Sequence, residues 1–395
     1  MQYTFSDKIS TLQPSAIREI LKYTADPTVV PFAAGNPAPE AFPVELIGEI
    51  TADILSREPI AALQYSFTEG YPPLRELLKK MLKERYGIGR DTDELIAVSG
   101  AQQGIELACK VLCNEGDVII CEKPSFIGSL NSFKSYNAKL VGIELEEDGI
   151  DLNKLEDALK YNNNVRFIYV IPNFQNPSGR TMSLAKRRAV YSLAKKYGTL
   201  ILEDNPYGEL RFAGEHLPSI KSFDEDGIVV YCGSFSKILS PGLRVGFVSA
   251  PNQVVQKMVV AKQASDVHTA ILSQMICARF LTLVNFEEHV ARLREIYRKK
   301  CALMLGLMDK GFAGKVSYTR PEGGLFLWCT LPEGADMMGF CTEAVQRKVA
   351  VVPGSAFMVS GSDQTQSFRM NFSTPTDAQI EKGVEILSKL IAEKY

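Results

Sequence analysis

Short apolar runs alternate with helix-period stretches through the middle of the chain, and this alternation constrains the fold more than any other feature. Five runs are rich in β-branched side chains, are bounded by turn residues and are predicted strands: residues 118–121, 139–145, 165–172, 199–204 and 228–234. Between them, apolar residues recur every three or four positions in residues 152–160 and 183–198, which indicates helices. The alternation predicts an α/β domain around a mainly parallel sheet that is buried on both faces.

A different pattern follows from about residue 286. A long amphipathic stretch leads into three strand-like pieces and a last helical stretch: residues 286–311, 324–331, 349–354, 367–373 and 377–395. We interpret this region as a smaller α+β domain. The first forty or so residues are rich in proline and glycine and are expected to pack against it. The predicted domains are therefore residues 46–285, and residues 1–45 together with 286–395.

The composition of the chain excludes several classes of protein. With 395 residues, 46% of them hydrophobic, the chain can bury a large core. A net charge of −2, with acids and bases evenly mixed, does not favour nucleic acid or an anionic membrane as a partner. No apolar run reaches the roughly 18 residues of a membrane-spanning helix, and the N-terminus lacks the basic and apolar regions of a secretory signal. We therefore expect neither nucleic acid nor membrane as a partner.

The cysteines and histidines argue against a metal site. The eight cysteines are scattered without a C-x-x-C pair, and the three histidines are too few and too dispersed for a histidine-based site. We interpret the cysteines as reduced, buried residues of a cytoplasmic protein.

One polar segment follows the last predicted strand of the sheet. Residues 233–244 combine a lysine, Lys237, with three serines, two glycines and Arg244. Hydroxyl and guanidinium groups suit a phosphate dianion, and a lysine beside them can form an imine with a carbonyl compound. The alternative is a polar loop with a surface lysine, and this segment alone does not decide between the two.

A carboxylate marks the end of the preceding predicted strand. Ligands of α/β sheets bind at the carboxyl ends of the strands, and Asp204 lies there. A carboxylate at this place can hold the proton on a pyridine nitrogen, which an electron-withdrawing ring cofactor requires. A regular strand turns Glu203 to the opposite face, so we prefer Asp204. Tyr207, three residues later, could reach a phenolic oxygen of the same ring.

Two further segments can contribute donors. Residues 98–104 run from a strand into a helix, and free N–H groups at a helix N-terminus form a phosphate cradle. The patterns G-x-G-x-x-G and G-x-x-x-x-G-K-[ST] are both absent, which argues against a dinucleotide fold or a P-loop. Asn176 is held by the proline that follows it and can donate from a fixed place to a phenolate or carboxylate oxygen.

Together these motifs make the chain recognisable over essentially its whole length. It resembles the fold-type I, class I aminotransferases, and within them the aminoadipate/kynurenine subgroup, which includes a lysine-biosynthesis enzyme. The matching motifs occur in the family's order and spacing: LQYSFTEGYPPLR, VSGAQQGIEL, FQNPSGRTM, LEDNPYGEL, GSFSKILSPGLRVGF, RPEGGLFLW and FRMNFS. The resemblance implies an α/β fold in which a mainly parallel, seven-stranded type of sheet forms an α/β/α sandwich beside a smaller α+β domain.

The resemblance also implies a cofactor, pyridoxal 5′-phosphate (PLP), and the residues that bind it. Lys237 would hold PLP as a Schiff base and act as general base and acid, and Asp204 would pair with the pyridinium nitrogen. Asn176 and Tyr207 would hydrogen-bond the phenolic oxygen. Family members are homodimers with shared active sites, and Tyr65 matches the tyrosine that reaches the phosphate of the partner subunit. The remaining phosphate ligands would be Gly100, Ala101, Gln102, Ser234, Ser236 and Arg244.

For the substrate, the resemblance implies an arginine clamp. Arg369 matches the residue that binds the α-carboxylate, and Asn176 and Gly35 match residues that contact the substrate. Arg18 matches an N-terminal helix residue that pairs with a side-chain carboxylate in the lysine-biosynthesis relative, and an exposed helix arginine is the alternative. Phe126 replaces the usual tyrosine stacked on the ring, so stacking is kept and a hydroxyl is lost.

The resemblance implies a ping-pong transamination between an amino acid and a 2-oxo acid. The expected acceptor is 2-oxoglutarate, and the donor is an aromatic amino acid, 2-aminoadipate or a broad range. One alternative is another PLP reaction on the same fold, such as β-elimination or decarboxylation. A second is a non-catalytic PLP-binding sensor, but such regulators begin with a DNA-binding domain, whereas this chain enters the aminotransferase-like region within its first twenty residues.

Overall fold

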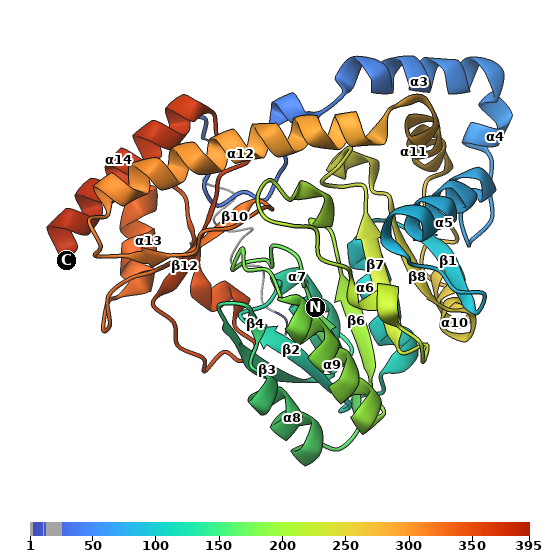
Figure 1. Ribbon diagram of the computed structural model, residues 1–395, viewed down its shortest axis with the longest axis horizontal. Coiled ribbons are helices and arrows are strands. Elements are labelled where there is room, and N and C mark those ends of the chain that lie inside the picture. The colour runs from blue at the N-terminus through green and yellow to red at the C-terminus, as the bar shows by residue number, and fades with distance from the viewer. Residues whose placement is uncertain (1–2, 11, 13–25) are drawn as a thin grey trace.

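A computed structural model describes residues 3–10, 12 and 26–395 of the chain (Figure 1). These residues form an eight-stranded sheet of order β1-β8-β7-β6-β5-β2-β3-β4 and a four-stranded sheet of order β11-β12-β10-β9. The large sheet consists of β1 (Asp93–Val98), β2 (Val118–Lys123), β3 (Lys139–Glu146), β4 (Gly149–Ile150), β5 (Val165–Val170), β6 (Leu200–Asp204), β7 (Val229–Ser234) and β8 (Gly246–Pro251). The small sheet consists of β9 (Ser317–Tyr318), β10 (Phe326–Thr330), β11 (Val352–Pro353) and β12 (Ser367–Asn371).

The large sheet is mainly parallel, as predicted. Its neighbouring strands β7, β6, β5, β2 and β3 all run in one direction. Strand β8 is antiparallel to both of its neighbours, and β4 pairs antiparallel with β3 at the sheet edge. The short β4 adds one strand to the seven of the predicted type.

Helices cover both faces of the large sheet, because alternate residues of each strand point to opposite sides. Along β5, Phe167 packs in one apolar cluster with α6 and α7, whereas its neighbour Ile168 packs in another with α8 and α9. The sheet is therefore the middle layer of the predicted α/β/α sandwich. Its covering helices are α6 (Ala101–Leu112), α7 (Ile127–Lys134), α8 (Leu152–Tyr161), α9 (Leu184–Tyr197) and α10 (Asn252–Gln263).

A third apolar cluster lies at the β1 edge of the sheet, where α11 contacts three helices from the first quarter of the chain. These elements are α3 (Val44–Arg57), α4 (Pro59–Leu63), α5 (Pro72–Tyr86) and α11 (Ile271–Leu283). The shorter helical segments of the described chain are α1 (Asp7–Ser10), η1 (Pro39–Ala41), η2 (Gly208–Leu210), η3 (Ile220–Phe223), η4 (Pro241–Leu243) and η5 (Gly354–Phe357).

Three helices pack with the small sheet: α12 (Phe286–Gly311), α13 (Met337–Gln346) and α14 (Asp377–Lys394). Helix α12 begins after Asn285, whose side chain accepts from a backbone N–H of the first turn, and α14 begins at a capping box formed by Thr376 and Gln379. Figure 1 shows α12 running from α11 to the far side of the molecule, where it lies against α14.

The segment of residues 29–36, called the N-terminal segment below, lies against the small sheet. Val30 pairs with Val349 in a parallel bridge, and the N–H of Asn371 in β12 donates to the carbonyl of Phe32 at 2.8 Å. This pairing brings the neighbouring glycine, Gly35, toward the large sheet. The domain limits at residues 46–285, and 1–45 with 286–395, stay a prediction.

Within the described residues, no helix is long and apolar enough to cross a membrane. The same part of the chain contains no group of three or more histidine, cysteine or carboxylate side chains arranged to hold a metal ion. The eight cysteines are all free, and all are buried except the half-buried Cys113.

Candidate active site

A cavity of about 390 Å³ lies at the carboxyl ends of the parallel strands. The large sheet contributes the residues that follow β5, β6 and β7, and the start of α6 closes one side. The small sheet contributes Phe326 of β10 and Arg369 of β12, and the N-terminal segment contributes Gly35. The cavity therefore lies where three distant segments of the chain meet, at the place where α/β sheets bind ligands.

Lys237 lies in this cavity, three residues after the end of β7. Its Nζ donates to the carbonyl of Gly35 at 2.7 Å. Burial of the amine, together with the positive charges of Arg369 and Arg244, lowers the pKa of Lys237 to about 8. Near pH 8, Lys237 is therefore neutral in a larger fraction of molecules than an exposed lysine would be. The neutral amine is the nucleophilic and basic form.

Asp204 ends β6 and is buried against the cavity wall. Its Oδ2 accepts a hydrogen bond of 2.8 Å from the Tyr169 hydroxyl, and its buried Oδ1 has no hydrogen-bond partner among the described residues. Burial raises the pKa of Asp204 to about 7. A buried carboxylate oxygen without a donor can accept from a cationic N–H that enters the cavity.

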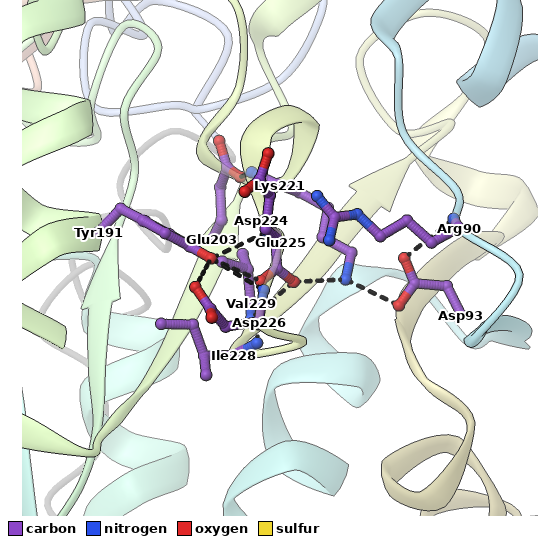
Figure 2. A network of polar contacts seen from close by, with 10 residues as sticks. All are labelled: Arg90, Asp93, Tyr191, Glu203, Lys221, Asp224, Glu225, Asp226, Ile228 and Val229. Atoms are coloured by element: carbon purple, nitrogen blue, oxygen red, sulfur yellow. Dashed lines mark hydrogen bonds and ion pairs between the residues drawn. The ribbon is translucent and has the colours of Figure 1, made fainter. Parts of the chain in front are cut away.

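Glu203 points to the other face of the sheet, as the alternation of a regular strand predicts. Its carboxylate oxygens accept from the backbone N–H groups of Ile220 at 3.0 Å and Lys221 at 2.8 Å. Figure 2 shows this side of the sheet, where Lys221 also pairs with Asp93 and Asp224 in a buried network. Glu203 therefore anchors a loop and does not face the cavity.

Asn176, Tyr207 and Arg369 form one connected group inside the cavity. The Asn176 amide donates from Nδ2 to the Tyr207 hydroxyl at 3.3 Å and accepts at Oδ1 from Nη1 of Arg369 at 2.8 Å. Burial raises the pKa of Tyr207, so this phenol remains a neutral donor at neutral pH. The group can present hydrogen-bond donors to a phenolic oxygen and a carboxylate at the same time.

The Arg369 guanidinium is held firmly in place. Its Nη2 donates to the carbonyl of Ala33 at 3.0 Å, and its carbon lies 4.3 Å from the ring centre of Phe326 and 4.9 Å from that of Phe357. The buried Nε has no partner among the described residues, and burial lowers the pKa of the group to about 10. An anion bound beside this fixed fork would satisfy the remaining donors.

Donors for a phosphate meet at the start of α6. The first helical residues are Ala101 and Gln102, and no side chain caps their free N–H groups. Arg244 reaches the same place and donates from Nη2 to the carbonyl of Ser99 at 3.1 Å. A glycine suits this position, because residue 100 has a φ of +79° and a Cβ would lie 2.2 Å from Nη2 of Arg244 unless that side chain moved.

The serines and Gln102 complete this end of the cavity. Ser234 Oγ accepts from the backbone N–H of Ser236 at 3.0 Å, and both residues line the cavity. The side-chain amide of Gln102 donates to the carbonyl of Gly128 at 2.9 Å and to Ser132 Oγ at 2.8 Å. The resemblance assigns both the backbone and the side chain of Gln102 to the phosphate, and this assignment stays a prediction; here the side-chain amide binds α7, whereas no side chain caps the backbone N–H.

The structure treats the remaining three predicted residues differently. Phe126, just before α7, lines the cavity with an apolar ring face. Tyr65 is 80% exposed and does not line this cavity, and its nearest aromatic neighbour is His268, edge-on at 5.9 Å. Arg18 lies outside the described residues.

Sequence reasoning missed several residues around the site. Tyr169 binds Asp204 from the neighbouring strand β5, and Phe326 and Phe357 enclose Arg369. The only signal for Tyr169 was a hydroxyl among the apolar residues of a predicted strand, and Phe326 lies in the motif RPEGGLFLW. Phe357 gave no signal, because a phenylalanine in an apolar region is ordinary core.

Comparison with known proteins agrees with this geometry. The model of the family "Aminotransferase class I and II" matches residues 27–387. Aromatic-amino-acid aminotransferase 1 of Thermococcus litoralis is 39% identical over 394 residues, which cover 99% of this chain and 94% of that protein. The 2-aminoadipate transaminase of Thermus thermophilus is 38% identical over 390 residues, with coverage of 98% and 96%.

A solved structure shows the same fold. The kynurenine aminotransferase of Pyrococcus horikoshii, solved with pyridoxamine phosphate (PMP), has a TM-score of 0.95 at 36% sequence identity. The alignment covers 99% of this chain and 97% of that one. The chain therefore belongs to the class I and II aminotransferases. It is a PLP-dependent aminotransferase, and the predicted family and fold type are confirmed.

Proposed function

We propose that the protein transfers an amino group from a broad range of amino acids, including aromatic amino acids and 2-aminoadipate, to 2-oxoglutarate by a ping-pong mechanism. The observation that supports this most is the meeting of Lys237, Asp204 and Arg369 in one cavity. The three provide an amine, a buried carboxylate and a carboxylate-binding cation, which are the groups that PLP-dependent transamination requires. The similar proteins named for aromatic amino acids, 2-aminoadipate and kynurenine support the donor range.

Each residue of the cavity has a proposed task. Lys237 would hold the cofactor through its Nζ, and the free amine would act as the base and acid for the proton at the substrate Cα. Its lowered pKa suits this task, because a base must be neutral to accept a proton. Asp204 holds the proton of the ring nitrogen through Oδ1. When bound, PLP supplies a ring that withdraws the electron pair of the broken Cα–H bond.

The other residues of the cavity would position the cofactor and the substrate relative to each other. Asn176 and Tyr207 would bind the phenolic oxygen, and Phe126 would stack on the ring. Arg369 binds the substrate α-carboxylate through its free donors, and Gly35 lies beside it. A phosphate would bind to the donors of Ala101, Gln102, Ser234, Ser236 and Arg244, beside Gly100, whose own N–H donates to the carbonyl of Val98.

The proposal includes a homodimer with shared active sites. Apolar side chains along α4 and the segment after it are exposed, including Leu63 (73%), Tyr65 (80%) and Phe67 (64%). A patch of this kind marks an interface, and Tyr65 would then reach the phosphate of the partner subunit. Leu63→Glu is expected to yield monomers in sedimentation analysis. Tyr161→Glu, at an exposed site on α8, should remain dimeric, and a monomeric wild type would contradict the proposal.

The visible spectrum of the purified protein tests the reaction. The absorption band of the bound cofactor should convert to the pyridoxamine form with single amino acids of the donor group and return with 2-oxoglutarate. Lys237→Ala should abolish turnover, and near-wild-type activity in this variant would refute its assignment. A band that no amino acid changes would favour the sensor alternative, and release of ammonia and pyruvate would favour a lyase.

A further inference from the structure

A buried chain of hydroxyl groups lies behind Asp204. Ser129 of α7 donates from Oγ to the Tyr169 hydroxyl at 2.8 Å, and Tyr169 of β5 donates to Oδ2 of Asp204 at 2.8 Å. The exposed fraction is 0% for Ser129, 0% for Tyr169 and 3% for Asp204. These hydrogen bonds are shielded from water, where a donor to a carboxylate has its full effect.

These hydrogen bonds make the two carboxylate oxygens of Asp204 different. Rotation about the last side-chain bond of an aspartate is broad and nearly two-fold, so the carboxylate does not fix its own orientation. Here Oδ2 is bound by Tyr169, whereas the buried Oδ1 has no partner among the described residues. One oxygen is therefore anchored and the other is left for a ligand.

We propose that Tyr169 is the positioning residue for Asp204: its hydroxyl anchors Oδ2 so that Oδ1 faces the ring nitrogen of the cofactor as the acceptor. The inference rests on the proposed role of Asp204. Ser129 sets the direction of the two hydrogen bonds. Its hydroxyl donates to a lone pair of the Tyr169 oxygen, so the phenolic proton of Tyr169 points to Asp204.

The electrostatics of the three residues support the same direction of donation. Burial raises the pKa of Asp204, while the hydrogen bond from Tyr169 acts against this rise and favours the carboxylate. Burial and the negative charge of Asp204 raise the pKa of Tyr169, so the phenol keeps its proton. Burial raises the pKa of the nearby Glu122 of β2 to about 8. Its carboxyl group accepts from the backbone N–H of Ile171, whereas the Tyr169 hydroxyl donates to Asp204.

Tyr169→Phe removes the hydroxyl and keeps the ring, which packs edge-on against Phe133 at 5.3 Å. Tyr231→Phe is the matched control, because Tyr231 is an equally buried phenol on the other strand beside β6, and its hydroxyl accepts from Asn205 at 2.8 Å. Ser129→Ala is a second variant, which removes the hydrogen bond to the Tyr169 hydroxyl but no contact of Asp204 itself. Circular dichroism and thermal melting identify any variant that does not fold.

The cofactor-free chain is titrated with PLP and with its carbocyclic analogue, in which C–H replaces the ring nitrogen, and binding is followed by absorbance. At metal centres, the hydrogen-bond partners that orient the ligating groups typically contribute 10–100-fold in affinity or activity, and we take the lower end as the guide for Asp204. We expect Tyr169→Phe to weaken PLP binding roughly 10-fold and to leave binding of the analogue unchanged within about 2-fold. Ser129→Ala should weaken PLP binding less, and Tyr231→Phe should change neither ligand.

The outcomes separate the inference from the function on which it rests. Equal weakening of PLP and analogue by Tyr169→Phe would show a purely structural tyrosine and overturn the inference. Unchanged binding of PLP in that variant would overturn it as well. If the wild-type protein binds the analogue as tightly as PLP, Asp204 is not the partner of the ring nitrogen, and the proposed role of Asp204 itself fails.

Discussion

Gly100→Ala should lower both the folding stability of the protein and its affinity for PLP, for two different physical reasons. Gly100 has a φ of +79°, and a Cβ there would lie 2.2 Å from Nη2 and 2.8 Å from Cζ of Arg244. The guanidinium is the far end of a flexible, exposed side chain, so it can move away at little cost. In doing so, it would lose the carbonyl of Ser99 and leave the proposed phosphate site.

The two expected magnitudes have different origins. Placing an alanine at the φ of +79° and ψ of 159° of Gly100 costs roughly 1–3 kcal/mol of folding free energy. Displacing the guanidinium removes a charge-assisted hydrogen bond to the phosphate, worth roughly 1.5–3 kcal/mol. This loss corresponds to about a 10–100-fold weaker affinity for PLP.

Gly116→Ala is the matched control. Gly116 has a similar φ of +81°, but a Cβ there would meet no atom within 4 Å. Urea unfolding should show a loss of stability in both variants, whereas titration with PLP should show weaker binding only in Gly100→Ala. Arg244→Ala should weaken binding by a similar factor, and the double variant Gly100→Ala/Arg244→Ala should lose little more, because both changes remove one contact.

Two results would refute this reasoning. Wild-type affinity in Gly100→Ala would mean that Arg244 stays in place or does not bind the phosphate. An equal loss of affinity in Gly116→Ala would mean that backbone strain, and not the displaced guanidinium, weakens the cofactor site.

Two further changes test the electrostatics of the cavity. Arg369→Lys keeps the charge but loses the planar fork, so kcat/KM should fall about 10–100-fold, and unchanged kinetics would contradict the carboxylate clamp. Lys237→Met tests the lowered pKa in the cofactor-free chain. Between pH 8 and 10.5 the unfolded chain still binds the lysine proton that the folded chain has lost, so the unfolding free energy of the wild type should rise with pH relative to the variant. A constant difference in unfolding free energy across this range would show that the pKa of Lys237 is not lowered.

The strands of the large sheet were largely predictable because they are short and apolar. The five predicted runs correspond to β2, β3, β5, β6 and β7, and the long helix predicted at 286–311 is α12. Strand β8 was not predicted, because GFVSAP begins with glycine and ends with proline and contains few β-branched residues. Its place between β1 and β7 depends on long-range pairing that local composition does not show.

Within the site, residues fixed by local geometry were predictable and residues fixed by distant neighbours were not. The alternation of side chains along β6 was enough to place Asp204 and Glu203 on opposite faces. The anchoring of Asp204 by Tyr169 depends on the pairing of β5 with β6. The contacts of the Gln102 side chain could not be predicted, because its partners Gly128 and Ser132 lie on α7, which folds beside α6.

The sequence by itself determined the α/β class and the order of the motifs, and it singled out Lys237 as a candidate, because hydrophobic period and residue type are local properties. Only the tertiary structure decided how Gly35, Lys237 and Arg369 meet, since they come from three segments that are far apart in the chain. The lowered pKa of Lys237 has the same origin. Burial and neighbouring charge act through space, and a linear sequence does not contain these distances.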